Sequence, residues 1–163
     1  MNIQWPQGFI KPSNYDDKLS EKKSSILKKE IEYFFTKKFS YKSILVPSAR
    51  AGIALIIKFY NLNRSHEIFV SKWSPYCVLN TISFFSNPTT SLKNANMVIA
   101  NHNWANEHKL KKGHKKIVVE DSADTIHLSK KSFFLNNSEF EIVSLPKIIG
   151  SYSGGLIYTK NKS

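Results

Sequence analysis

Three short segments carry the side chains that could do chemistry in this sequence, and each follows an apolar run. The segments are residues 48–52 (SARAG), 120–124 (EDSAD) and 144–147 (SLPK). Small residues that open a helix allow its free backbone N–H groups to approach a phosphate. An acidic residue at the end of a buried strand needs a cationic or hydrogen-bonding partner. A lysine in a tight, desolvated loop is a stronger nucleophile, because burial favours its uncharged form.

Each of these segments also has a purely structural interpretation. Ser48 could cap a helix, Asp121 could cap a turn, and Lys147 could be a solvated surface residue. Residue type alone leaves these alternatives open. Functional groups in open α/β sheets gather at the carboxyl ends of strands, so three such segments in one chain favour a shared site.

The hydrophobic pattern predicts helices that alternate with strands and would hold these segments in place. An amphipathic helix is expected over residues 20–38, with Ser20 as its cap and lysines opposite its apolar face. Further helices are expected over residues 50–62 and 76–85. The expected strands cover residues 44–46, 67–71, 97–100, 116–120, 140–145 and 155–159. This alternation predicts an α/β layered domain with a largely parallel sheet.

Length and composition favour one compact domain. The chain has 163 residues, close to the ~150 of a typical domain, and its 41% hydrophobic residues can bury enough surface to offset the entropy of ordering. No apolar run approaches the ~18 residues of a membrane span, and no secretory pattern is visible at the N-terminus. The single cysteine, Cys77, cannot form an internal disulfide. We therefore expect a cytoplasmic protein without a membrane partner.

The net charge of +12 attracts phosphates, whether in nucleic acids, lipid headgroups or nucleotide-linked metabolites. Only Arg50 and Arg64 are arginines, whereas base and phosphate recognition favours the planar guanidinium. The many lysines and asparagines could also reflect coding bias. One cysteine and five scattered histidines show no zinc-ligand spacing, and the sequence contains no Gly-x-x-x-x-Gly-Lys-Ser/Thr phosphate loop. No metal is therefore expected.

The order of these segments resembles the DegT/DnrJ/StrS family of pyridoxal 5′-phosphate (PLP)-dependent sugar aminotransferases. Residues 118–124 (VVEDSAD) resemble the family's EDAAQ-like stretch, and residues 144–155 (SLPKIIGSYSGG) resemble its Ser…Lys-x-x-Gly-x-x-x-Gly-Gly stretch at a similar separation. Upstream, residues 47–55 (PSARAGIAL) look like its SGTAAL segment, and residues 70–77 (VSKWSPYC) are similar to its VPAYTC stretch. The resemblance covers roughly residues 43–160.

The resemblance implies a role for each residue of the site. Lys147 would form the Schiff base with PLP, because only a primary amine can do so. Asp121 would pair with the pyridine nitrogen and keep it protonated, so that the ring works as an electron sink. Trp73 or Tyr76 would lie against the ring face. The phosphate would be held at a helix start by Ser48, Ala49 and Arg50, together with Ser144.

Asp124 departs from the family pattern, because it stands where the family usually has Gln, near the cofactor's phenolic oxygen. A carboxylate there would repel a phenolate, so Asp124 is protonated, or it turns away, or the chemistry differs. Ser144 and Lys147 are also only three residues apart, a shorter spacing than is common in the family.

The resemblance also implies a fold and a domain organisation. The expected fold is the large domain of the aspartate aminotransferase type, with a mostly parallel central sheet flanked by helices. Residues 1–42 would form an N-terminal segment with an amphipathic helix, and residues 43–163 a PLP-binding α/β domain. We expect no counterpart of the family's C-terminal small domain within residues 43–163. In relatives the active site is shared across a two-fold dimer, so a homodimer is expected.

Three functional hypotheses follow. The first is a PLP-dependent aminotransferase that moves an amino group from an amino-acid donor to a nucleotide-linked keto-sugar in bacterial surface-polysaccharide synthesis. The second is a shortened, weakly active or inactive relative that serves as the partner of a complete subunit. The third, ranked well below, is a basic module that binds nucleic acid or an anionic surface.

Overall fold

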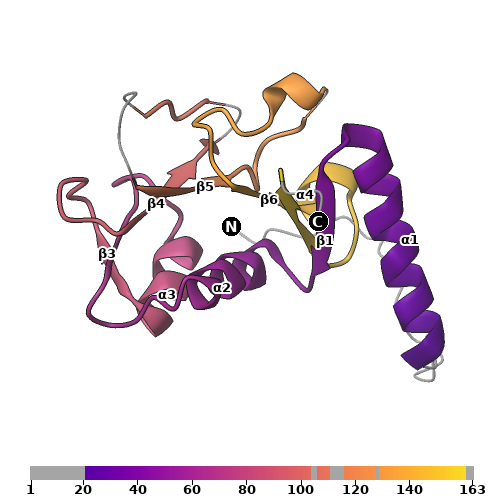
Figure 1. The fold of residues 1–163 in the computed structure, drawn as a ribbon, viewed down its shortest axis with the longest axis horizontal. Helices are drawn as coiled ribbons and strands as arrows, with labels where there is room; N and C mark the ends of the chain where they lie inside the picture. Colours follow the sequence, from indigo (N-terminus) through magenta and orange to yellow (C-terminus); the bar gives the residue numbers. More distant parts are fainter. Residues whose placement is uncertain (1–20, 104–105, 111–115, 128, 161–163) are drawn as a thin grey trace, which may run out of the picture.

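A computed structural model of the chain describes residues 21–103, 106–110, 116–127 and 129–160, and its centre is a seven-stranded sheet (Figure 1). The sheet order is β1-β7-β6-β5-β4-β2-β3. β7 runs antiparallel to both of its neighbours, and all other pairs are parallel. The strands are β1 (Lys42–Val46), β2 (Glu67–Phe69), β3 (Asn87–Thr89), β4 (Met97–Asn101), β5 (Ile117–Asp121), β6 (Phe140–Ser144) and β7 (Gly155–Thr159). The predicted α/β fold with a mostly parallel sheet is confirmed.

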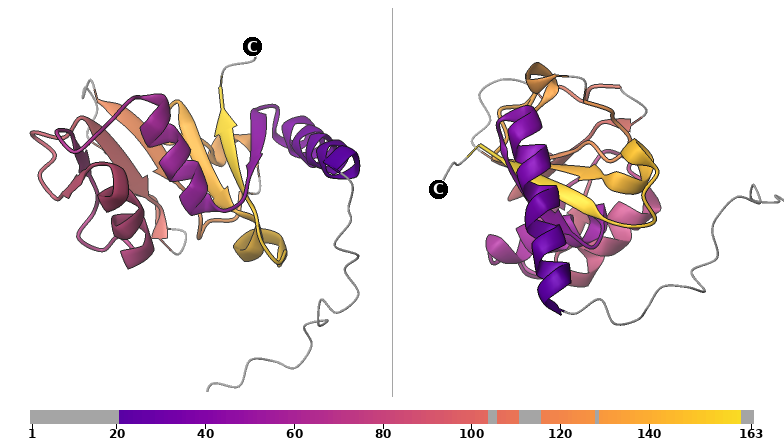
Figure 2. Two further views of the ribbon diagram at one scale, coloured as in Figure 1. Left: turned by 90° about the horizontal axis from the view of Figure 1, so that it is seen from below. Right: turned by 90° about the vertical axis from the view of Figure 1, so that its right-hand side faces the viewer.

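The helices are distributed around this sheet. They are α1 (Glu21–Phe39), α2 (Ala49–Phe59), α3 (Tyr76–Phe85) and α4 (Leu145–Ile149), with a 3-10 turn at η2 (Lys130–Ser132). Figure 2 shows α2 and α3 packed together on one face of the sheet, while α1 lies beside β1 at the sheet edge. In the part of the chain that the structure describes, no helix is long and apolar enough to cross a membrane.

Alternation along the strands builds a separate core on each face of the sheet. Ile142 of β6 and Ile157 of β7 pack with α2 and α3 on one face. Their neighbours Val143 and Leu156 point the other way and pack with aromatic residues from α1 and from the segment around η2. Successive side chains of a strand point to opposite faces. The sequence of a strand that is buried on both faces is therefore a continuous apolar run.

The element boundaries differ from the predictions in a few places. The second helix ends at Phe59, because Asn61 adopts a left-handed backbone conformation with φ 52°. β2 ends at Phe69, two residues before the predicted end. Three elements were not predicted: β3, whose polar residues and proline suit a sheet edge, α4, a five-residue helix, and the 3-10 turn η2. The predicted cap at Ser20 lies outside the described residues.

The Leu156→Ala substitution tests the dependence of the fold on the core that α1 covers. Leu156 is fully buried, so truncation leaves a cavity and should lower the free energy of unfolding by about 2–5 kcal/mol. Urea denaturation followed by circular dichroism measures the change. Leu55→Ala, at a leucine that is 49% exposed on α2, serves as the control and should cost far less. Equal losses in the two variants would contradict this assignment of the core.

Candidate active site

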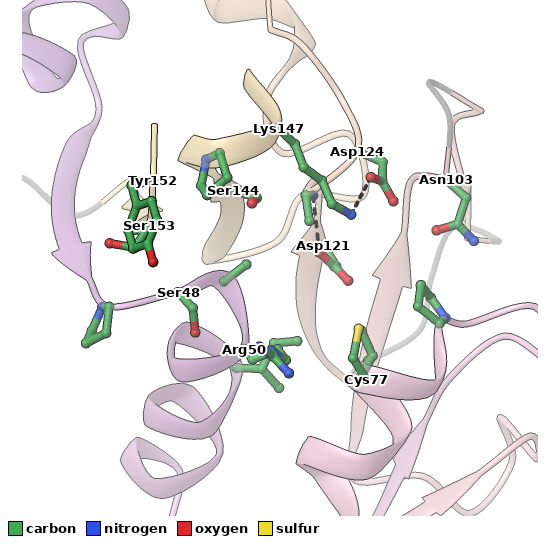
Figure 3. Close-up of a pocket in the computed structure, with 18 residues that line it drawn as sticks. Ser48, Arg50, Cys77, Asn103, Asp121, Asp124, Ser144, Lys147, Tyr152 and Ser153 are labelled. Carbon is green, nitrogen blue, oxygen red and sulfur yellow. Dashed lines mark hydrogen bonds and ion pairs between the residues drawn. The ribbon is translucent and has the colours of Figure 1, made fainter. Parts of the chain in front are cut away.

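A cavity of about 490 Å³ lies where the carboxyl ends of the central strands meet the starts of the helices (Figure 3). It is bounded by the starts of α2 and α3, by the end of β5 with the turn after it, and by α4 with the loop to β7. Asn101, Asp121 and Ser144 end β4, β5 and β6, each two positions after a core residue of the face that carries α2 and α3. Alternation therefore directs all three toward the same side of the sheet.

The structure brings most of the predicted site residues together. The cavity lining includes seven of them: Ser48, Ala49, Arg50, Asp121, Asp124, Ser144 and Lys147. Trp73 and Tyr76 are not part of this lining, and they are 75% and 80% exposed. The Trp73 ring lies instead under the ammonium group of Lys72, and Pro75, Cys77 and Val78 form the wall at the start of α3. The assigned roles remain predictions.

The start of α2 has the geometry of an anion-binding helix end. Ser48 is its N-cap, with extended backbone, and its Oγ accepts a hydrogen bond from the Ala51 N–H at 3.2 Å. The first N–H groups of a helix have no partner within the helix, so those of Ala49 and Arg50 are available at the cavity wall. α2 carries no acidic residue in its first turn, which leaves the positive end of its dipole uncompensated.

Gly155 allows this helix start to pack directly on the sheet. A Cβ atom at Gly155 would lie 2.6 Å from the Ala49 backbone nitrogen and 2.8 Å from the Ser48 carbonyl carbon. Both distances are shorter than the 3.0 Å at which a Cβ atom can approach another heavy atom, so no side chain fits here. The neighbouring Gly154 has a φ of 107°, and its N–H donates to the Pro47 carbonyl oxygen at 3.0 Å. The Gly-Gly pair in the sequence therefore has a structural role at the predicted phosphate site.

Asp121 is held at the floor of the cavity by amide donors. Its side chain is almost completely buried, with 6% of the residue exposed. Oδ2 accepts from Nδ2 of Asn101 at 2.7 Å, and Oδ1 accepts from the Ala123 N–H at 3.2 Å. Burial raises the pKa of the Asp121 carboxyl, and the two hydrogen bonds oppose this effect without cancelling it. A cationic N–H group in the cavity would supply the charge partner that the amides do not, which fits the ring nitrogen of PLP.

Asn101 is a site residue that the sequence analysis missed. It pairs with Asp121 in the parallel β4–β5 register, and its Oδ1 accepts from the Ser74 hydroxyl at 2.5 Å. This chain of contacts, from Ser74 to Asn101 to Asp121, fixes the orientation of the carboxylate. The available signal was a polar residue at the end of a fully buried strand, the same signal that identified Asp121.

Lys147 points into the cavity from α4 and pairs with Asp124 (Figure 3). Its Nζ lies 2.5 Å from Oδ1 of Asp124, which belongs to the turn after β5. The side chains are 53% and 24% exposed, so water screens this pair more than it screens Asp121. The sequence left open whether Asp124 is protonated, turns away from the phenolic oxygen or serves different chemistry. In the structure its carboxylate faces Lys147.

On the opposite face of the sheet from the cavity, Glu120 contacts a histidine and an asparagine. Glu120 is fully buried, and its Oε2 lies 2.5 Å from Nε2 of His102. The backbone N–H of Asn136 donates to Oε1 at 2.7 Å, and its side-chain Nδ2 donates to Oε2 at 2.9 Å. Burial alone would raise the pKa of Glu120, but the hydrogen bonds from His102 and Asn136 lower it overall. Glu120 thus fastens the loop after β4 and the segment before β6 to β5.

Glu141 fastens the turn after β5, which carries Asp124, to β6. Its Oε1 accepts from the Ser122 hydroxyl at 2.6 Å, and its Oε2 accepts from the Phe134 N–H at 2.5 Å. Nε2 of His127 lies 2.8 Å from Oε1 without the alignment of a hydrogen bond, and the His127 ring stacks on Phe133 at 3.8 Å. His102 and His127 therefore have structural partners on the far side of the sheet from the cavity.

The basic stretch over residues 109–116 is described only at its ends. Lys109 forms an exposed ion pair with Glu107 at 2.7 Å. Lys116 donates to the carbonyl oxygens of Lys93 and Ala95 at 3.0 and 2.5 Å. Both of these lysines therefore have local partners. Residues 111–115 lie outside the described part of the chain.

Several solved structures with a similar fold are aminotransferases. NtdA from Bacillus subtilis with bound PMP has a TM-score of 0.67 and 14% identity, over 82% of this chain and 37% of that chain. An aminotransferase from Psychrobacter cryohalolentis gives 0.63 and 12%, over 83% and 42%. DesI in the presence of its TDP-sugar product gives 0.64 and 13%, also over 83% and 42%. The fold is that of PLP-dependent aminotransferases, and the chain spans less than half of each of these proteins.

The sequence itself identifies the family. A family model described as "Putative PLP-dependent aminotransferase" matches residues 31–162, which is most of the chain. The chain therefore belongs to this family, whose cofactor is PLP. No curated protein matches the sequence.

The lowered pKa of Glu120 predicts a pH-dependent loss of stability in Glu120→Gln. A carboxyl with a lowered folded-state pKa stabilises the fold above its ordinary value of 4.5, and this contribution disappears as the pH falls below that value. The variant should lose about 3 kcal/mol of unfolding free energy at pH 7 and progressively less below pH 4.5. Urea titrations across this range measure the difference. Exposed Glu30→Gln should change little, and a loss in Glu120→Gln that is independent of pH would contradict the assignment.

Gly155→Ala should disturb the predicted phosphate site. The added Cβ collides with backbone atoms of Ser48 and Ala49, so the start of α2 must move, at a cost of about 1–3 kcal/mol in stability. PLP affinity, measured by absorbance titration, should fall at least about tenfold, because misplaced helix N–H groups lose their contact with the phosphate. In the control Gly150→Ala the new Cβ meets no atom within 4 Å, and only the left-handed backbone is strained. Equal PLP affinity in the two variants would contradict the role given to Gly155.

Proposed function

We propose that this chain is a PLP-dependent aminotransferase that transfers an amino group from an amino-acid donor to a nucleotide-linked keto-sugar. We place the reaction in bacterial surface-polysaccharide synthesis, in the cytoplasm, with the chain acting as a homodimer. Residues 43–163 would form the cofactor-binding domain of the DegT/DnrJ/StrS type, and residues 1–42 would form the segment that precedes it.

One observation carries the proposal: three groups of complementary chemistry converge on one cavity from different elements. The amine of Lys147 comes from α4, the buried acid of Asp121 from β5, and the free N–H groups from the start of α2. A ligand that carries a carbonyl group, a basic ring nitrogen and a phosphate would match all three. PLP has this combination of groups.

Each of these residues has a definite task. Bound PLP supplies an aldehyde carbon and an electron-accepting ring. Lys147 offers the primary amine for that aldehyde, and the same nitrogen can afterwards hold or deliver a proton within the cavity. Asp121 orients the ring nitrogen and keeps it protonated, since Asn101 fixes the direction of its carboxylate. The start of α2 receives the phosphate, with Ser144 on the adjoining wall.

Two observations support the finer parts of the proposal. DesI, which shares the fold, was solved in the presence of a TDP-sugar product, and the +12 charge of this chain favours a substrate that is itself an anionic phosphate ester. Tyr152, which lines the cavity, is also 90% exposed, and Trp73 and Tyr76, near the start of α3 in the sequence, are 75% and 80% exposed. Exposed apolar groups of this kind mark interaction surfaces, which supports a dimer with its site near the interface.

The proposal is tested by adding PLP to the purified protein and recording the visible absorbance of a lysine adduct. The parent protein should develop this absorbance, and Lys147→Ala should abolish it. Lys109→Ala is the matched control, because Lys109 is also paired with a carboxylate but lies outside the cavity lining. No absorbance in the parent, or its persistence in Lys147→Ala, would refute the role of Lys147.

Amino transfer is then measured directly with a nucleotide-linked keto-sugar and L-glutamate, with mass spectrometry of the sugar product. Formation of the amino sugar by the parent, and its loss in Lys147→Ala, would support the enzymatic proposal. PLP absorbance without transfer would instead support a weakly active or inactive relative that serves as a partner subunit. Salt-sensitive retention on heparin without PLP uptake would favour the basic binding module.

A further inference from the structure

The contact between Asp124 and Lys147 is a specific feature of this cavity. Asp124 belongs to the turn that follows β5, whereas Lys147 belongs to α4, and their side chains meet with Nζ 2.5 Å from Oδ1. Both residues line the cavity, and the close-up view shows the two side chains directed at each other (Figure 3). The pair therefore holds the lysine against one wall of the cavity.

Asp124 is the carboxylate best placed to act as the counter-ion of this lysine. Asp121 is the other acid of the cavity, but both of its oxygens accept hydrogen bonds from amides, namely Asn101 Nδ2 and the Ala123 N–H. The remaining titratable side chains that line the cavity come from α2, α3 and the loop before β7, and they are Arg50, Cys77 and Tyr152. The positive charge of Arg50 would repel the ammonium, whereas Asp124 attracts it and contacts it directly.

We infer that Asp124 is a positioning residue that keeps the Lys147 ammonium docked, and so restrains its attack on carbonyl groups. The inference rests on the proposed function, because it assigns Lys147 as the reacting amine. An ammonium ion has no lone pair, so Nζ must leave Asp124 and lose a proton to water before it can react. The uncharged nitrogen then bonds the carbonyl carbon of an aldehyde, and the aldehyde oxygen leaves as water with the two remaining protons of the amine.

Competitive labelling of the cofactor-free protein with acetic anhydride tests this restraint without any enzymatic activity. In this reaction Nζ bonds a carbonyl carbon, acetate leaves, and the nitrogen releases a proton. Mass spectrometry of the peptide that contains Lys147 measures the rate. At pH 7 the rate in Asp124→Asn should exceed that of the parent about three- to fivefold, as expected for the loss of a partly exposed ion pair. The excess should shrink as the pH rises into the alkaline range in which a lysine loses its proton, because the ion pair then no longer exists.

Two further variants separate positioning from a general effect on charge or folding. Glu107→Gln also removes one negative charge and releases a paired lysine, so it should accelerate the labelling of Lys109 and leave Lys147 unchanged. Asp124→Glu keeps the carboxylate and should restore the slow labelling of Lys147. Asp124→Ala repeats the test if the asparagine variant does not fold. Equal rates for Lys147 in the parent and in the folded neutral variants at pH 7, or an excess that does not shrink as the pH rises, would overturn the inference.

The rate of PLP uptake separates this inference from the proposed function. If both are correct, the visible absorbance should develop about three- to fivefold faster in Asp124→Asn than in the parent at pH 7. If the parent takes up no PLP but labelling still responds to Asp124→Asn, the proposed function fails while the restraint on Lys147 stands. If PLP is taken up at the same rate in both proteins and labelling is also equal, the restraint fails while the proposed function stands.

Discussion

The cavity depends on the strand register at the edge of the sheet that is formed by the carboxyl ends of β1, β4, β5 and β6 and by the start of β7. Gly155, the first residue of the antiparallel β7, pairs with Val46 at the end of β1 and with Ser144 at the end of β6. The starts of α2 and α4, which follow these two strands, are thereby placed on either side of one glycine. The parallel pairing of Asn101 with Asp121 then adds β4 and β5 at the same edge. A one-residue slip in any of these pairings would turn a site residue to the other face.

The two adjacent acids of β5, Glu120 and Asp121, lie on opposite faces of the sheet in different environments. Glu120 points away from the cavity, where a histidine and an asparagine surround it and its pKa is lowered. Asp121 points into the cavity, where only amides contact it and burial raises its pKa. The first environment is complete and serves stability, whereas the second still lacks a cationic partner. Incomplete neutralisation of a buried acid is typical of a binding site, because the missing charge arrives with the ligand.

Sequence patterns could predict some residues at strand ends, such as Asp121, but they did not identify Asn101 or the partners of these residues. Asp121 and Lys147 were found because a polar residue interrupts a buried apolar run, and the structure puts both at one cavity. The exposure of Trp73 and Tyr76 depends on how the start of α3 and the residues before it are placed, which composition does not determine. β3 exists only through its pairing with β2, so its own polar residues gave no signal. The contact of Asp124 with Lys147 joins residues 23 positions apart, and only the packed turn after β5 creates it.

The charges that line the cavity explain why these residues suit a ligand with both an anionic and a cationic end. Arg50 and the start of α2 make one end of the cavity positive, while Asp121 makes the floor negative. The Asp124–Lys147 pair lies on the other wall and is neutral overall. A phosphate at the first end and a protonated ring nitrogen at the floor would each meet a complementary field, and the pair would add no net repulsion to either. By the inference made above, Asp124 can then hold the amine without disturbing the binding of the ligand that it is to attack, so binding and reactivity would depend on different carboxylates.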